Sequence, residues 1–340
     1  MSELRSILVE QVDRLVSDGG GIALLRQVEA GAWPAAFWAG LEGQGLNLAL
    51  VPEAAGGVGL TWGDAAALWQ VLGRHGAPAP IAETMLGAAL LSAAGIEVPQ
   101  GPLGLGGAGV PFGRHAARLV VLAGAGVALH ACGEATHAQN IGREPRDGMT
   151  PGARLARGEL PNSFGPRAAL LGLALIRAAL IAGALERILA LAVDWANTRR
   201  QFGRAIGKFQ AVQQQLAAMT GEVAAVQVAV AQAARAVDAR GLAEAGFEIA
   251  CAKIIAGEAA TMGAAVAHQV FAAIGITEDH ELHHFTRRLW SWREEGGTER
   301  FWATEIGRAA LARGGANLWP DITARDAAAS DDRRAVSAQA

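Results

Sequence analysis

The stretch from Thr198 to Met219 reads TRRQFGRAIGKFQAVQQQLAAM. A long apolar segment ends here in a basic cluster, which consists of Arg199, Arg200, Arg204 and Lys208. A short turn with Gly203 and Gly207 follows, and a glutamine-rich helix is predicted from Phe209. Cations are favoured at a helix C-terminus by the helix dipole, but a guanidinium can also fork onto a phosphate. From the spacing, the cluster is either a helix end or a phosphate-binding loop.

Composition narrows the class of protein. The chain has 340 residues, of which 51% are hydrophobic and 18% charged, and its formal net charge is -3. This length allows one to three domains. The near-neutral charge gives no electrostatic reason to expect nucleic acid or an anionic membrane as a partner. Cys132 and Cys251 form no CxxC pair, so two free thiols in a reducing cytosol are expected.

No targeting or membrane-spanning segment is predicted. The N-terminus, MSELRSILVEQVDRLV, is an amphipathic helix with acids mixed in. The most apolar region, residues 168–185, is interrupted by Arg177 and is followed by Glu186 and Arg187. It is therefore expected to be a core helix rather than a membrane span, and the protein is expected to be cytoplasmic.

The first half of the chain divides into two predicted domains. Residues 1–98 form a helical domain, with helices expected over residues 2–16, 33–46 and 82–94. Thr61 or Asp64 can cap a further helix. Residues 99–160 are dense in glycine and proline and form a reduced β domain, with two strands around the turn at residues 124–126.

The second half is predicted to be a helical bundle. Residues 161–318 contain four long helical segments, expected over residues 167–198, 209–240, 243–272 and 278–313. Long helices joined by short turns pack as an antiparallel four-helix bundle. Residues 319–340 are polar and unpatterned and are expected to be a disordered tail. The predicted fold class is mainly α with a small β insert.

These motifs resemble those of the acyl-CoA dehydrogenase family. The segment RRQFGRAIGKFQAVQ looks like the family's flavin-contacting segment, and residues 268–277 resemble its Gln-x-x-Gly-Gly-x-Gly turn. RRLWSWREEGGTERFWATEIGRAAL resembles the closing motif with its Glu-Gly-Thr, and VPEAAGGVGLTWGDAAAL extends the likeness toward the N-terminus. The resemblance implies a helical domain, a middle β domain and a C-terminal four-helix bundle, which agrees with the predicted order.

The resemblance also implies a reaction and a cofactor. Family members desaturate an acyl-CoA thioester: a carboxylate removes the α proton while the β hydrogen leaves as hydride to FAD. Electrons then pass to an electron-transfer flavoprotein. Carried over by position, Arg199 would face the pyrophosphate, and Gln201, Phe202 and Gln210 would line the adenosine side. Gln269 and Ala273 would offer amide and backbone contacts, and Thr298 would contact flavin.

One departure from the family concerns the catalytic base. Gly296 stands where the family usually has its catalytic glutamate. A shifted Glu295 is an alternative base; otherwise Glu294 and Glu295 are a solvated helix end paired with Arg293. The β insert is also short and contains no tryptophan.

The shortened insert and the missing base resemble bacterial heteromeric members that act on bulky CoA thioesters, including steroid side chains. The chain is therefore predicted to complete FAD sites in a homologous partner subunit of an α2β2 complex, with the base in that partner. Two alternatives are a self-sufficient homo-oligomer that uses Glu295 and a non-catalytic scaffold relative.

Two further patterns predict different chemistry. Gly104 to Gly109 matches GxGxxG, but Pro102 precedes it and Val110-Pro111 follows, so no helix can begin where a dinucleotide phosphate would lie. We interpret this segment as a linker.

The second pattern, His280-Glu281-Leu-His-His284, matches the HExxH zinc signature, and Glu299 is available as a third ligand. The family resemblance makes a metal site unexpected here. A zinc hydrolase that uses His280, Glu281 and His284 remains as an alternative.

Overall fold

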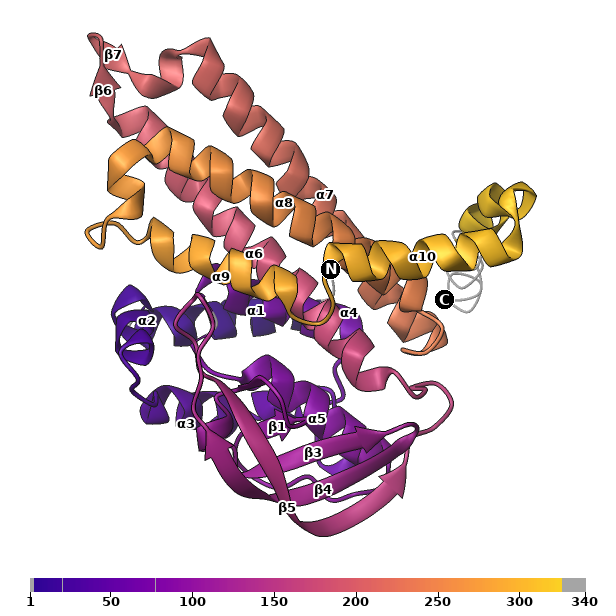
Figure 1. Cartoon of the computed structure of the whole chain (residues 1–340). Helices are drawn as coiled ribbons and strands as arrows, with labels where there is room; N and C mark the ends of the chain where they lie inside the picture. Colours follow the sequence, from indigo (N-terminus) through magenta and orange to yellow (C-terminus); the bar gives the residue numbers. More distant parts are fainter. Residues whose placement is uncertain (1–2, 20, 77, 326–340) are drawn as a thin grey trace.

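The computed structural model describes residues 3–19, 21–76 and 78–325. Helices come first, a small sheet follows, and helices return (Figure 1). The first layer contains α1 (Glu3–Asp18), α2 (Gly21–Glu29), α3 (Ala35–Gly43), α4 (Trp62–Arg74) and α5 (Ile81–Ala93). The last contains α6 (Ala168–Thr198), α7 (Gln210–Arg240), α8 (Gly246–Phe271), α9 (Leu282–Glu294) and α10 (Glu299–Arg313). The predicted class, mainly α with a small β insert, is confirmed.

Helix α4 joins the N-terminal helices to the bundle. Thr61 is its N-cap, since its hydroxyl oxygen accepts a hydrogen bond from the backbone N–H of Asp64. The close approach of α4 and α6 needs two glycines. A Cβ on Gly73 would lie 2.1 Å from the carbonyl oxygen of Leu180, and one on Gly183 would lie 1.8 Å from a carbonyl oxygen of α4. The two backbones therefore touch directly.

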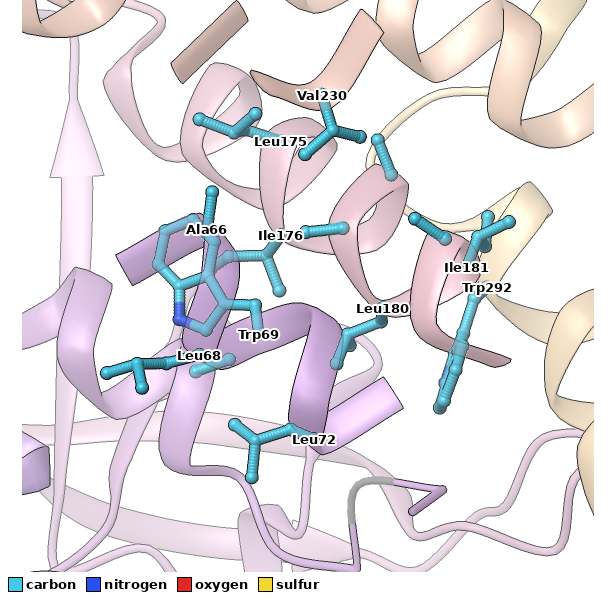
Figure 2. Close-up of a cluster of buried hydrophobic side chains, with 14 of the residues drawn as sticks. Ala66, Leu68, Trp69, Leu72, Leu175, Ile176, Leu180, Ile181, Val230 and Trp292 are labelled. Atoms are coloured by element: carbon cyan, nitrogen blue, oxygen red, sulfur yellow. The ribbon is translucent and has the colours of Figure 1, made fainter. Parts of the chain in front are cut away.

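The main hydrophobic core lies along α6. Trp69 of α4 is fully buried against residues that include Ile176 and Leu180 of α6, and Val230 approaches from α7 (Figure 2). Burial of an aliphatic side chain contributes about 1.5–3 kcal/mol. This shared core holds the N-terminal helices and the bundle as one packed unit.

The sheet has the strand order β1-β3-β4-β5-β2. Its strands are β1 (Leu103–Leu105), β2 (Val110–Pro111), β3 (Arg118–Ala123), β4 (Gly126–Thr136) and β5 (Arg146–Glu159). The strands β3 and β4 meet at the predicted turn. The linker interpretation of the GxGxxG segment is wrong in part, because β1 pairs parallel with β3. Leu103 and Leu105 of β1 are buried. Strand β2 follows Gly109 directly, so no helix begins where a dinucleotide phosphate would lie.

The last helical segment is divided into two helices. A single helix was expected over residues 278–313, but the structure has α9 and α10 with a break between them. Gly296 and Gly297 both have positive φ, 68° and 92°, which an α-helix does not allow. This turn separates the two helices and redirects the chain (Figure 1).

The prediction of a disordered tail over residues 319–340 is wrong for residues 319–325. Residues 315–325 are helical, and an ion pair joins Arg313 to Asp321 at 2.7 Å. Arg325 also pairs with Glu248 of α8 at 3.1 Å. These contacts fold the segment back toward the bundle. Residues 326–340 lie outside the described residues.

Three helical stretches in the described part of the chain are long and apolar enough to cross a membrane by length and composition alone. Residues 168–185 were expected to form a core helix, and their burial in the protein confirms this. The composition of α6 has a simpler cause, since 83% of its most apolar window is buried inside the protein. The corresponding windows of α7 and of residues 246–276 are 28% and 44% buried.

Candidate functional site

A hairpin with a two-residue turn connects α6 to α7. Strand β6 (Arg200–Gln201) pairs antiparallel with β7 (Arg204–Ala205). The turn between them has positive φ at both Phe202 (50°) and Gly203 (79°). This is the pattern of a type I′ turn, whose twist matches that of paired strands. The hairpin therefore extends from the end of the bundle as a defined structure (Figure 1).

The side chains around this hairpin are available to a ligand. Phe202 is 91% exposed, and the guanidinium of Arg204 lies 4.1 Å from the centre of the Phe209 ring. That of Arg199 lies 6.0 Å from the centre of the Trp195 ring. Within the described residues, none of the four side chains of the basic cluster pairs with a carboxylate. Exposed guanidinium groups without acidic partners favour the phosphate-binding alternative.

The end of α8 brings further predicted contacts to the same end of the bundle. Gln269 lies in the last turn of α8, Ala273 lies in η5 (Ala272–Ile276), and both are exposed. Phe271 stacks on Trp195 of α6 with ring centres 5.1 Å apart, so the two helix ends are adjacent. The structure therefore gathers six predicted FAD contacts at one end of the bundle: Arg199, Gln201, Phe202, Gln210, Gln269 and Ala273.

Ala272 carries backbone strain in this turn. It stands at the first glycine position of the family's motif and has φ 55° and ψ −141°, a region almost confined to glycine. Ala272→Gly is therefore expected to raise the free energy of unfolding by about 1 kcal/mol, measured by urea denaturation. Ala273→Gly is the control, because Ala273 lacks a positive φ and its substitution should destabilise. Equal destabilisation by both substitutions would show that Ala272 is unstrained.

Thr298 lies elsewhere. Its hydroxyl oxygen accepts a hydrogen bond from the backbone N–H of Phe301 at 3.2 Å, which makes it the N-cap of α10. The next residue, Glu299, packs against Gly257 of α8. At 1.5 Å per residue, Gly257 is about 18 Å along α8 from Gln269. Within one chain the structure does not bring Thr298 to the other six residues, and its flavin contact stays a prediction.

Glu295, the predicted alternative base, lies between two buried arginines. One carboxylate oxygen accepts a hydrogen bond from Nε of Arg146 at 2.8 Å and the other from Nε of Arg177 at 2.6 Å. Burial would raise the pKa of this carboxyl, but the charges of Arg146 and Arg177 lower it to about 2. A general base works best with a pKa near the working pH. These contacts make Glu295 a structural anion and oppose the predicted catalytic role.

The alternative of a solvated helix end holds for only one of the two adjacent acids. The carboxylate of Glu294 is 61% exposed and lies 3.6 Å from the guanidinium of Arg293. Glu295 points instead into the protein, where its side chain is 22% exposed. The two neighbours differ because the helix ends between them and the chain turns at Gly296.

The ion pairs of Glu295 belong to a larger network. Arg177 also pairs with Glu83 of α5 at 2.6 Å, and Arg146 pairs with Glu144 at 3.0 Å. Glu144 also accepts a hydrogen bond from the indole N–H of Trp292 at 2.9 Å. Buried charges persist when they are paired. This closure network, made of Glu83, Glu144, Arg146, Arg177 and Glu295, joins α5, the sheet, α6 and α9.

The position aligned with the family's catalytic glutamate is closed by α6. A Cβ on Gly296 would lie 2.9 Å from the backbone nitrogen of Ala174 and 3.0 Å from its Cα. A Cβ on Gly297 would lie 2.6 Å from the indole nitrogen of Trp302. A carboxylate side chain at either position would require the surrounding structure to move.

Little open space remains beside the closure network. The cavity there has a volume of about 10 Å³. Its walls include Glu83, Phe112, Glu144, Arg146, Arg177 and Trp292. Ligand sites for small molecules usually measure about 300–1,000 Å³. The residues here do not fit a flavin ring or a thioester, whereas the exposed hairpin end fits the phosphate-bearing part of FAD.

The zinc alternative is wrong. Glu281 pairs with Arg187 at 2.6 Å, and Nδ1 of His284 is hydrogen-bonded to Glu29 at 2.9 Å. The ring of His280 packs on Phe271 with centres 4.4 Å apart. His280 also lies before the start of α9, so the two histidines do not share a helix face. Within the described chain, no group of three or more histidine, cysteine, aspartate or glutamate residues is placed to hold a metal ion.

Most of the closure network was not recognised from the sequence. Its members are far apart in the chain, and each alone looks like an ordinary charge. One signal was available: Arg177 interrupts an otherwise apolar segment, and a charge within a core helix requires a buried partner. That partner proved to be Glu295 together with Glu83.

Comparison with known proteins identifies the family. The family model described as acyl-CoA dehydrogenase, C-terminal domain, matches residues 165–311. Acyl-CoA dehydrogenase IpdE2 of Mycobacterium tuberculosis is 33% identical over 304 residues, which cover 84% of this chain and 91% of that protein. The chain belongs to the acyl-CoA dehydrogenase family. Its cofactor class is accordingly FAD.

Solved structures of acyl-CoA dehydrogenases share the fold along nearly the whole chain. The ChsE4-ChsE5 complex from Mycobacterium tuberculosis has a chain with a TM-score of 0.79 and 23% identity, covering 92% of this chain and 98% of that one. The Tcur3481-Tcur3483 steroid ACAD, solved as its G363A variant, gives a TM-score of 0.80 and 24% identity, with 92% and 99% covered. The order of a helical layer, a sheet and a helical bundle is therefore that of the family.

Proposed function

We propose that this chain is the flavin-site-completing subunit of a heteromeric acyl-CoA dehydrogenase. The partner subunit supplies the catalytic base, and the complex performs FAD-dependent α,β-dehydrogenation of a bulky acyl-CoA thioester. The observation that carries this proposal is the closed base position. Gly296 lies against the backbone of α6, and Glu295 is held between Arg146 and Arg177.

The exposed end of the bundle supports the same division of labour. Arg199 lies beside the hairpin, and its guanidinium matches the geometry of a phosphate. Phe202 extends from the tip and is almost fully exposed. When FAD is bound, these side chains would orient its pyrophosphate and adenosine, and FAD would accept the hydride that the substrate loses. Exposed residues of this kind suit a cofactor that is held mostly by another chain.

The comparisons suggest the substrate class and the assembly. IpdE2 is an acyl-CoA dehydrogenase, the ChsE4-ChsE5 structure is a complex of two chains, and the Tcur3481-Tcur3483 protein is a steroid ACAD. We therefore assign a steroid-type acyl-CoA as the substrate and an α2β2 complex as the assembly. The cytoplasm is the proposed location. An electron-transfer flavoprotein is the proposed electron acceptor.

The first test is the visible absorption spectrum of the chain purified alone and after co-expression with its homologous partner. Flavin bands are expected only in the co-purified complex. Stoichiometric flavin in the lone chain would contradict the proposal and favour a self-sufficient homo-oligomer. A complex without flavin would favour a non-catalytic scaffold.

A substitution in the hairpin sharpens this test. Arg199→Ala in the complex is expected to weaken flavin binding at least tenfold, because a lost charged hydrogen bond to phosphate is worth about 1.5–3 kcal/mol. Arg235→Ala is the matched control, since Arg235 is also exposed and donates a hydrogen bond to Gln232 on the same helix. Equal dissociation constants for flavin in the two variants would exclude Arg199 from the site.

A further inference from the structure

A second polar cavity lies at the N-terminal end of α9. Its volume is about 360 Å³, within the range of small-ligand sites. The wall is formed by α2, by the loop that precedes β5 and by the start of α9. Its residues are Arg26, Glu29, Ala30, Arg143, Glu278, His283 and His284. None of them belongs to the proposed FAD contacts.

The acidic groups of this cavity are largely neutralised. Glu29 accepts hydrogen bonds from Nδ1 of His284 at 2.9 Å and from Arg287 at 2.7 Å, and it also pairs with Arg288. Burial alone would raise the pKa of Glu29, but His284 and Arg288 lower it to about 2. The carboxylate of Glu278 is 83% exposed. With Arg287 and Arg288 included, four guanidinium groups and two carboxylates surround the cavity, so the balance of charge is positive.

Two histidine nitrogens remain for a ligand. The side chain of His284 is only 4% exposed, and its Nε2 atom is buried without a hydrogen-bond partner among the described residues. Buried polar atoms in folded proteins are nearly always hydrogen-bonded, so an unpartnered one needs an explanation. Nδ1 of His283 lies 2.8 Å from the carbonyl oxygen of His280, which leaves its Nε2 atom for another contact.

Arg143 is positioned at this cavity by a tight turn. The backbone N–H of Glu144 donates to Oδ1 of Asn140 at 3.1 Å, and the N–H of Gly142 donates to Oγ of Ser291 at 3.1 Å. The turn fixes the backbone on both sides of Arg143, while its guanidinium keeps only a long ion pair of 3.7 Å to Glu278. An incoming anion can replace that weak pair without disturbing the fold.

We propose that this cavity binds a phosphate group through Arg26, Arg143, His283 and His284. Guanidinium groups donate charge-assisted hydrogen bonds to phosphate oxygens. An imidazole nitrogen that carries no proton accepts a hydrogen bond from the hydroxyl group of a monoprotonated phosphate. Glu278 is the one acid that a phosphate must displace, and its exposure lets it turn toward solvent. The phosphate has two possible sources, a free inorganic ion or the 3′-phosphate of coenzyme A.

The test is isothermal titration calorimetry of the intact protein with inorganic phosphate and, separately, with adenosine 3′,5′-bisphosphate. Saturable binding is expected for at least one probe. Arg143→Ala should weaken it about tenfold, the loss of one charge-assisted contact. Tighter binding of the bisphosphate identifies coenzyme A as the source, and equal or tighter binding of inorganic phosphate identifies the free ion.

The control variants distinguish specific binding in the cavity from nonspecific attraction of phosphate to charges on the surface. Arg308→Ala is the matched variant, because Arg308 makes a similar loose ion pair of 3.6 Å with Glu305 on the exposed face of α10, and it should bind like the unmodified protein. His283→Gln should also weaken binding, and it changes a side chain that takes no part in the ion pairs of Glu29. The proposal is overturned by non-saturable binding of both probes, or by equal affinities of the Arg143→Ala and Arg308→Ala variants.

Discussion

Gly296→Glu, which would place a glutamate at the family's base position, is expected to destabilise the protein by about 2–5 kcal/mol without producing an active site. The added Cβ would lie 2.9 Å from the backbone nitrogen of Ala174, and overpacking of this kind costs about 1–3 kcal/mol. The positive φ of Gly296 adds about 1–2 kcal/mol for a residue with a side chain. Urea unfolding followed by circular dichroism measures the change.

Gly314→Glu is the matched control for this substitution. Gly314 also has a positive φ, 82°, and also ends a helix, but a Cβ there meets no atom within 4 Å. The control should therefore show only the backbone part of the loss, about 1–3 kcal/mol, because φ 82° and ψ 146° are almost confined to glycine. Equal losses in the two variants would show that α6 does not close the base position. Dehydrogenase activity in the lone Gly296→Glu chain would contradict the proposed division of labour.

Glu295→Gln is expected to lower the free energy of unfolding by about 3 kcal/mol near neutral pH, because it leaves Arg146 and Arg177 without their shared anion. The pKa of Glu295 is lowered from 4.5 to about 2. A lowered carboxyl pKa contributes stability above the unfolded value of 4.5, and this contribution is lost as the pH falls toward 2. The free energy of unfolding of the wild-type protein and of the variant should be measured with urea between pH 7 and pH 2. The difference between the two values should become smaller as the pH falls.

The adjacent Glu294→Gln is the control for Glu295→Gln. Glu294 is exposed, and a surface ion pair contributes only about 0–1 kcal/mol, so its variant should unfold like the wild-type protein. In the heteromeric complex, Glu295→Gln should retain its flavin spectrum and its turnover at a temperature where it is folded. Loss of turnover in a folded, flavin-loaded complex would restore Glu295 as the base.

Local patterns predicted the helices, the sheet and the exposed cluster because these depend on nearby residues. The period of apolar residues located α6 and α7 to within about two residues, and the glycine-rich texture located the β insert. The basic cluster at Arg199 was visible because its members are neighbours in sequence. The resemblance added FAD, which spacing alone did not decide.

Features that depend on distant partners could not be predicted. Glu295 looks the same in sequence as Glu294, and only the approach of Arg146 and Arg177 separates an anchored anion from a solvated one. The break at Gly296 was missed because a helical period continues on both sides of it. The helix over residues 315–325 was missed because the ion pairs that support it join residues whose proximity depends on the fold.

The closure network also has a consequence for the order of folding during synthesis. Glu83, Glu144, Arg146 and Arg177 emerge from the ribosome well before Glu295, which lies between the two arginines in the finished protein. Until that residue is made, the two arginines share only the carboxylates of Glu83 and Glu144, and desolvating an ill-matched group of charges is unfavourable. Domains that fold during translation usually do so from the N-terminus onward. In this chain we infer that the helices of the N-terminal layer can collapse early, while the joint between the sheet and the bundle stays hydrated until nearly the whole polypeptide is available.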